Sequence, residues 1–206
     1  TSVSSESTPQ SSRSEVFAFV EKELKDVVGD GEGNEVLADK RATYGRADKV
    51  AGWILLSRLY LNAEVYTGSA QWQKAKDYAD KAIKGGYSLC TEGKNGYSAY
   101  QLLFMGDNDT NGAQNEIVLP AIHDGMETQT WGGCLFIIAA SNSSSKTDVN
   151  LGTSEKWGGN RVTKQFAEKF ITDEAAVKDL VEPSEVAKAA GDDRALLYGG
   201  DDRKVE

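Results

Sequence analysis

Two tryptophans lie in segments whose composition predicts loops. Trp131 and Trp157 are each followed directly by a Gly-Gly pair. A loop tryptophan beside glycine can present a flat apolar face to solvent, and the C–H face of a sugar ring packs well on such a face. The alternative is that each ring only anchors its loop to the core. The residue types therefore leave two interpretations open, a carbohydrate platform and a pair of structural anchors.

Two polar residues follow the second of these tryptophans. Asn160 and Arg161 come directly after the Gly-Gly pair of Trp157. Amide and guanidinium groups form hydrogen bonds with hydroxyls, so we expect them to bind sugar hydroxyls beside a stacked ring.

An Asn/Asp-rich segment at 107–112 has the form of the first half of a calcium loop. Asp107 and Asp109 supply carboxylates at alternate positions, and Gly112 allows a sharp turn. A complete EF-hand needs a glutamate at its twelfth position, where this chain has Val118. The segment therefore predicts either a looser calcium site, completed by ligands from elsewhere, or a solvated turn.

Catalytic interpretations find little support. His123 is the only histidine, which excludes zinc sites with several imidazoles and leaves a single candidate for Ser-His or Cys-His chemistry. No Gly-x-Ser-x-Gly motif accompanies it, and no local pattern selects two carboxylates as a glycosidase pair. Cys90 and Cys134 could form one disulfide or remain two thiols. We therefore expect a protein that is not an enzyme.

Composition excludes two further classes. The 206 residues include 23 Lys+Arg and 32 Asp+Glu, a net charge of -9, whereas nucleic-acid binders cluster basic residues. The longest apolar run, 134–140, is far shorter than the roughly 18 residues of a membrane span. The chain starts at a threonine and stops without a closing element, so we expect it to be a piece of a longer protein.

Local patterns then predict the elements that position these residues. A capping box at Ser12 and Glu15 opens an amphipathic helix over 13–28. An apolar helical stretch follows over 49–66, and a further helix begins at Trp72 and ends before Gly85 and Gly86.

The second and third of these helices are typical of a tetratricopeptide-like pair. Trp53, Leu56 and Tyr60 match the first helix of such a repeat, and small residues including Ala75 match the second. A generic helical hairpin is the alternative. We expect Trp53 and Trp72 to be core residues.

The pattern changes after this pair. Segments 116–120 and 133–140 predict short strands, and helical spacing returns near Arg161 and over 175–181. We expect residues 1–12 to form a polar linker and 13–206 to form the central portion of one domain. The predicted fold class is mainly α, a tetratricopeptide-like scaffold with irregular loop and short-strand insertions.

Several of these segments together resemble the SusD-like (SusD/RagB) family, and most closely its starch-binding branch. The resemblance covers nearly all of 10–200 in order and is carried by YGRADKVA at 44–51, LSRLYLNA at 56–63, NEIVLP at 115–120 and AGDDRAL at 190–196.

The resemblance implies a function. Members are outer-membrane surface lipoproteins of Bacteroidetes that bind glycans without catalysis and pass them to a SusC-like TonB-dependent transporter. The starch binders hold the glucan, starch or malto-oligosaccharide, against aromatic rings, two of which fall at Trp131 and Trp157. The family's structural Ca2+ loop falls at Asp109, within the segment that starts at Asp107. Membrane attachment would use only a lipid anchor outside this chain.

Departures from the family keep alternatives open. Members are more than twice as long, and the segment after Trp157 differs from that of the starch binders, so Asn160 and Arg161 rest on their chemistry alone. A different glycan, a protein-interaction scaffold without sugar binding and a glycoside hydrolase fragment remain as rivals.

Overall fold

The computed structural model of the chain consists mainly of helices and divides into two compact units. Unit 1 comprises Thr1–Ser88 and Asn115–Ala121, and unit 2 comprises Leu89–Gln114 and Ile122–Glu206. The expected mainly α class is confirmed, since the only β pairings among the described residues are two isolated bridges. The structure describes residues 9–32, 37–39, 41–122, 134–141, 155, 157–180 and 182–197.

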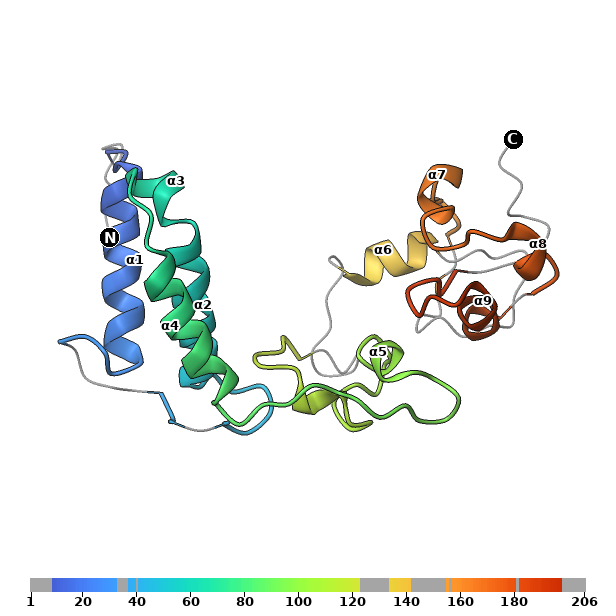
Figure 1. Ribbon diagram of the computed structural model, residues 1–206, viewed down its shortest axis with the longest axis horizontal. Helices are drawn as coiled ribbons and strands as arrows, with labels where there is room; N and C mark the ends of the chain where they lie inside the picture. The colour runs from blue at the N-terminus through green and yellow to red at the C-terminus, as the bar shows by residue number, and fades with distance from the viewer. Residues whose placement is uncertain are drawn as a thin grey trace, which may run out of the picture. The chain divides into compact units, whose positions relative to one another are not determined.

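In the described part of unit 1, the chain forms three longer helices and one short helix (Figure 1). The predicted capping box is present, because Ser12 accepts from the Glu15 amide while the Glu15 carboxylate accepts from the Ser12 amide. The apolar stretch predicted as one helix over 49–66 is divided at Asn62. The helices are α1 (Arg13–Val27), α2 (Lys49–Leu61), α3 (Ala63–Thr67) and α4 (Trp72–Ile83).

The core of unit 1 lies where α2 packs against α1 and α4. Ala75 is buried on α4, and its carbonyl accepts a 2.8 Å hydrogen bond from the Ser57 hydroxyl of α2. A small residue at this position allows the close approach expected of a tetratricopeptide-like pair. The buried core residues are Phe17, Val28, Leu56, Tyr60, Ala63 and Ala75.

The two tryptophans expected in this core differ. Trp53 packs against the buried cluster, as expected. Trp72 is 63% exposed, so its assignment to the core is wrong. Trp72 is the first residue of α4, one turn before Ala75 makes the contact with α2. Helical spacing predicted that Trp72 lies on the same face of α4 as Ala75. The contact of that face with α2 begins only at Ala75.

A buried carboxylate organises the start of α2. Asp48 is fully buried and accepts from the Ala51 amide at 3.2 Å, the Ala42 amide at 3.1 Å and the Tyr87 hydroxyl at 2.7 Å. Burial, together with the hydrogen bond to Asp48, raises the pKa of Tyr87 to about 12. One side chain therefore caps α2 and joins it to two other segments.

Segment 116–120, predicted as a strand, has no regular secondary structure. The return segment Asn115–Ala121 instead joins unit 1 through individual bonds. Asn115 accepts from the Arg41 guanidinium at 2.7 Å and from the Ser88 amide at 3.0 Å, and the Tyr87 hydroxyl lies 3.1 Å from the Val118 carbonyl oxygen. The short apolar run fitted a strand, but in the structure these bonds hold it as irregular backbone.

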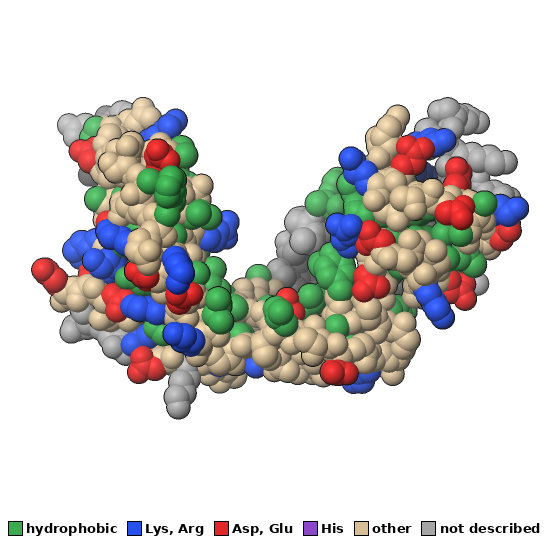
Figure 2. Space-filling view, viewed as in Figure 1, with side chains coloured by type: hydrophobic (Ala, Val, Ile, Leu, Met, Phe, Trp, Pro, Cys, Tyr) green, Lys and Arg blue, Asp and Glu red, His purple; other side chains and the backbone are tan. Residues whose placement is uncertain are grey.

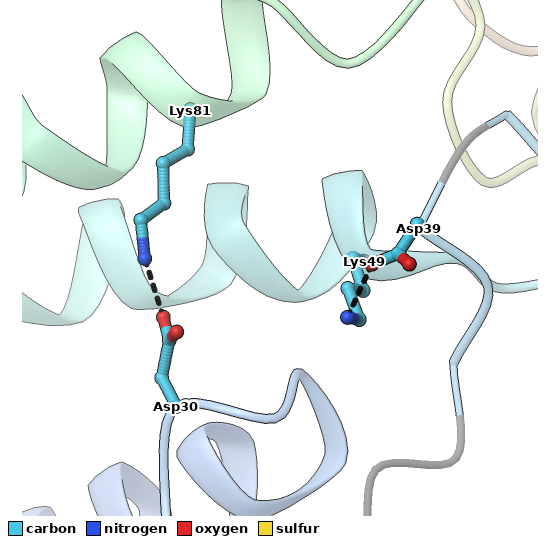
Figure 3. Close-up of polar contacts among 4 residues, drawn as sticks. All are labelled: Asp30, Asp39, Lys49 and Lys81. Atoms are coloured by element: carbon cyan, nitrogen blue, oxygen red, sulfur yellow. Dashed lines mark hydrogen bonds and ion pairs between the residues drawn. The ribbon is translucent and has the colours of Figure 1, made fainter.

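Two ion pairs join the connection between α1 and α2 to neighbouring helices (Figure 3). Lys81 of α4 reaches Asp30, which follows α1, at 2.6 Å, and its ammonium lies 4.7 Å from the centre of the Tyr78 ring. Lys49, the first residue of α2, pairs with Asp39. These contacts attach polar loops to the helices at both ends of the α1–α2 connection.

The described part of unit 2 contains short helices and one small buried cluster. Its buried cluster joins the segment after α7 to the last two helices through Ile171, Val177, Val186, Ala187 and Ala195. No helix among the described residues is long and apolar enough to cross a membrane. The helices of unit 2 are α5 (Ala99–Leu102), the 3-10 turn η1 (Ala113–Asn115), which ends in unit 1, α6 (Cys134–Ser141), α7 (Lys164–Ala167), α8 (Glu174–Val177) and α9 (Pro183–Ala190).

Unit 2 corrects several predictions. The apolar run predicted as a strand over 133–140 forms α6 instead. Seven consecutive apolar residues have no alternation, so periodicity cannot separate a buried strand from a helix. Helical turns do occur in the two later predicted regions, but α7 and α8 span only four residues each. Sequence analysis missed α9, although proline at its start and Gly191 at its end are typical helix signals.

Candidate functional site

The loop that carries Trp157 is bound to the end of α6. The Trp157 amide donates to the Ala139 carbonyl at 2.9 Å, and the Asn160 amide donates to the Ala140 carbonyl at 2.7 Å. The last carbonyls of a helix lack intrahelical partners, so the loop satisfies groups that would otherwise need water. Ala139 and Ala140 are themselves buried. The backbone on which Trp157 stands is therefore held by a helix end.

Glycine has a specific role between these two bonds. Gly158 adopts a φ of +65°, the left-handed conformation that residues with a Cβ rarely adopt. The reversal at Gly158 allows the chain to return for the Asn160 bond. Gly158 therefore shapes the loop.

The Trp157 side chain is presented to solvent with two neighbours. It is 55% exposed, in agreement with the prediction of a loop ring facing solvent. Its indole N–H donates to a Glu155 carboxylate oxygen at 3.2 Å. The Phe136 ring of α6 lies with its centre 5.5 Å away and its plane at 64° to the indole. Phe136 is also exposed, at 56%.

The remaining predicted binding residues fall into two groups. Asn160 and Arg161 lie beside Trp157 and are exposed, and the Arg161 guanidinium approaches only the Asn160 carbonyl, at 3.4 Å, among the hydrogen bonds described for it. Trp131 lies outside the described residues, as does His123, which was considered only as a catalytic candidate. The structure thus brings three of the four predicted sugar-binding residues to one loop, and the position of Trp131 stays a prediction.

Sequence reasoning missed Phe136 and Glu155. Phe136 belongs to the run that was predicted as a buried strand, and in a buried strand its side chain would lie within the core. A helix over the same run could have one side exposed to solvent. That prediction would have indicated Phe136 as a candidate surface ring. Glu155 gives no signal in the sequence, since an acidic residue two positions before a tryptophan is unremarkable.

These side chains have the chemistry of a binding surface for a neutral polyhydroxylated ligand. Two ring surfaces supply apolar area, and a carboxylate, an amide and a guanidinium surround them with acceptors and donors. Apolar faces with a polar rim match the alternating C–H faces and hydroxyl edges of sugars.

The 107–112 segment forms a turn organised by Asn111. The buried Asn111 amide donates to the Leu102 carbonyl and to Asp107 Oδ1, each at 3.0 Å, and its oxygen accepts from the Ala113 amide at 2.9 Å. Asp109 Oδ1 lies 3.4 Å from the Thr110 hydroxyl. Calcium takes about six to eight oxygen ligands. Within the described part of the chain, no three acidic, histidine or cysteine side chains gather as a metal site. Two carboxylates alone are fewer than a calcium ion requires, so the calcium loop at Asp107 and Asp109 stays a prediction.

The charged run near 192 contains a local salt bridge. Arg194 donates through two guanidinium nitrogens to Asp192, at 3.0 and 2.8 Å, and these bonds lower the pKa of Asp192 to about 2. The guanidinium also lies 5.1 Å from the centre of the Phe170 ring. The Gln101 amide of α5 donates to the Asp193 carbonyl at 3.4 Å. This run therefore connects elements within unit 2.

Comparisons with known proteins identify one kind of relative. No protein-family model matches the chain. The starch-binding protein SusD of Bacteroides thetaiotaomicron is 34% identical to it over an alignment of 221 residues. The alignment covers 93% of this chain and 38% of that protein, so the chain spans well under half the length of the curated relative it matches.

Proposed function

This chain is a SusD-like sequence over 93% of its length, and from that premise we propose that the protein binds a starch-like α-glucan without catalysis. The observation that supports the proposal best is the half-exposed Trp157 ring on a loop held by the end of α6. A rigidly mounted ring loses little freedom when a sugar stacks on it, which favours binding.

Simple energetics suit a capture protein. One aromatic face covered by a sugar ring contributes on the order of 1–2 kcal/mol from its apolar area. A few such contacts, after the cost of association, give roughly micromolar to millimolar dissociation constants. We propose that Trp131 supplies a second platform and that Asn160 and Arg161 bind hydroxyls beside Trp157. The weak binding would allow the glucan to be released.

The finer function follows from the family resemblance alone. We propose that the complete protein lies at the outer-membrane surface, held by a lipid anchor outside this chain. There it would pass starch or malto-oligosaccharides to a SusC-like TonB-dependent transporter. A neutral glucan needs no electrostatic steering, so the net charge of -9 is compatible with this function.

The proposal is tested by electrophoresis of the full-length protein through native gels with and without amylopectin. Replacing Trp157 with alanine is expected to weaken the apparent affinity about 5- to 30-fold, because the apolar platform and its roughly 1–2 kcal/mol are lost. Trp131→Ala is expected to act in the same direction. Trp72→Ala is the matched control, since Trp72 is 63% exposed but lies on unit 1. It should leave retardation unchanged.

Two results would contradict the proposal. If well-folded protein is not retarded, starch is not the ligand, and a panel of other glycans would distinguish a different specificity from a protein-interaction scaffold. If retardation occurs but neither Trp157→Ala nor Trp131→Ala weakens it, the binding site lies elsewhere. Release of glucan products by the protein would support a hydrolase instead.

We also propose that a calcium ion stabilises the 107–112 turn, with Asp109 and Asp107 among its ligands and the others supplied from elsewhere in the protein. The proposal is supported by the two carboxylates at alternate positions and by the resemblance. Removing calcium with a chelator is expected to lower the melting temperature of the full-length protein by a few degrees, and added calcium should restore it. An Asp109→Asn variant should lose most of this dependence. Equal melting temperatures with and without chelator would exclude the site.

A further inference from the structure

We propose that Phe136 is a second sugar-contacting ring, so that the bound glycan spans Phe136 and Trp157 together. The inference rests on the proposed glucan-binding function and extends it to a residue that the sequence patterns did not indicate. Phe136 and Trp157 are named the ring pair below.

The ring pair is exposed, and its two residues stand on segments that are hydrogen-bonded to each other. Phe136 and Trp157 are 56% and 55% exposed, although their ring centres are only 5.5 Å apart. Phe136 stands on α6, and the loop of Trp157 is hydrogen-bonded to the carbonyls of Ala139 and Ala140 at the end of the same helix. Hydrophobic side chains are visible at the surface of both units in Figure 2. The ring pair differs from these other exposed side chains because hydrogen bonds join the Trp157 loop to the helix that carries Phe136.

The geometry of the ring pair limits how a sugar can use it. The planes meet at 64°, so one pyranose ring cannot lie flat on both. When one sugar stacks on Trp157, Phe136 can contact the next sugar of the chain or another edge of the same sugar. Two faces inclined in this way fit a chain whose successive sugars turn relative to one another better than a flat ribbon.

Polar groups around the ring pair favour a glycan over an apolar peptide segment. The Glu155 carboxylate accepts the indole N–H and holds the ring edge, while Asn160 and Arg161 are exposed within four positions of Trp157. An apolar peptide face docking here would have to desolvate a carboxylate and a guanidinium. Sugar hydroxyls can form hydrogen bonds with the same groups.

The test uses the full-length protein in native gels over a series of amylopectin concentrations, which gives an apparent dissociation constant. Phe136→Leu keeps an apolar residue on α6 but removes the flat ring, and we expect it to weaken binding about 3- to 10-fold. Phe136→Tyr keeps the ring and should bind within about twofold of the unmodified protein. Phe104→Leu removes another phenylalanine of unit 2, 67% exposed, and should have no effect.

A double substitution separates contact from support. If Phe136 itself touches the glycan, Phe136→Leu also weakens the binding that remains in a Trp157→Ala background. If Phe136 acts only by orienting Trp157, it has no further effect in that background, and the proposal is overturned. A twofold or smaller effect of Phe136→Leu, with Trp157→Ala still disruptive, also overturns it and leaves the proposed function intact. If neither Trp157→Ala nor Trp131→Ala weakens binding, the result contradicts the proposed function instead.

Discussion

Replacing Asp48 with alanine is expected to lower the free energy of unfolding by about 2–4 kcal/mol. The substitution removes the cap of α2, which contributes roughly 0.5–2 kcal/mol in other helices. It also leaves the part-buried Ala42 amide without its acceptor, at about 1–3 kcal/mol for a donor that finds no other partner. The Tyr87 hydroxyl loses its shorter hydrogen bond but keeps the Val118 carbonyl, 3.1 Å away, as an acceptor. Denaturant titration of the full-length protein, followed by circular dichroism, measures the change.

Asp80→Ala is the matched control for Asp48→Ala. Asp80 lies on the outer surface of α4 and pairs with Lys76 at 2.6 Å, an exposed contact between residues four apart. Such pairs contribute about 0.3–0.5 kcal/mol, so the control should unfold at nearly the same denaturant concentration as the unmodified protein. Equal losses for Asp48→Ala and Asp80→Ala would show that the Asp48 network does not stabilise unit 1.

Leu56→Ala is expected to lower the free energy of unfolding by about 2–5 kcal/mol. Leu56 has 0% exposure and lies in the buried cluster between α2 and its neighbours. Removing its branched end loses the transfer free energy of the buried methyl groups and leaves a cavity that the surrounding helices fill only in part. The same denaturant titration measures the loss.

The chain offers the same substitution on the same helix as a control. Leu61, the last residue of α2, is 60% exposed, and Leu61→Ala should change the free energy of unfolding by less than about 0.5 kcal/mol. A large loss for Leu61→Ala would mean that its side chain is covered in the full-length protein. A small loss for Leu56→Ala would contradict the packing of α2 described above.

The helices of unit 1 could be predicted because their signals are local. The capping box at Ser12 and Glu15 places the start of α1, and Gly85 and Gly86 follow the end of α4 closely. Hydrophobic spacing identified α2 as well, although the break at Asn62 was not expected. Capping, periodicity and glycine act within a few residues, so sequence contains the information.

The site was predictable only in part. Trp157 was identified because a tryptophan beside glycine is unusual in a loop, and its exposure confirmed that it faces solvent. Trp72 was assigned to the core from helical spacing, yet burial depends on whether a neighbouring helix reaches that turn. Trp131 stays a prediction. The sequence shows where the aromatic residues are, whereas the exposure of each ring depends on the helices and loops that pack against it.

Sequence by itself thus determined the helical class, the approximate positions of α1, α2 and α4 in unit 1, the family resemblance and the exposure expected of Trp157. Tertiary structure decided that the apolar run at 134–140 lies in a helix and that Phe136 stands beside Trp157. An apolar run satisfies its backbone equally well as a buried helix or a buried strand, so its conformation depends on what packs around it. The ring pair exists because loop amides bond to the carbonyls at the end of α6, and such contacts between distant positions leave no local pattern in the chain.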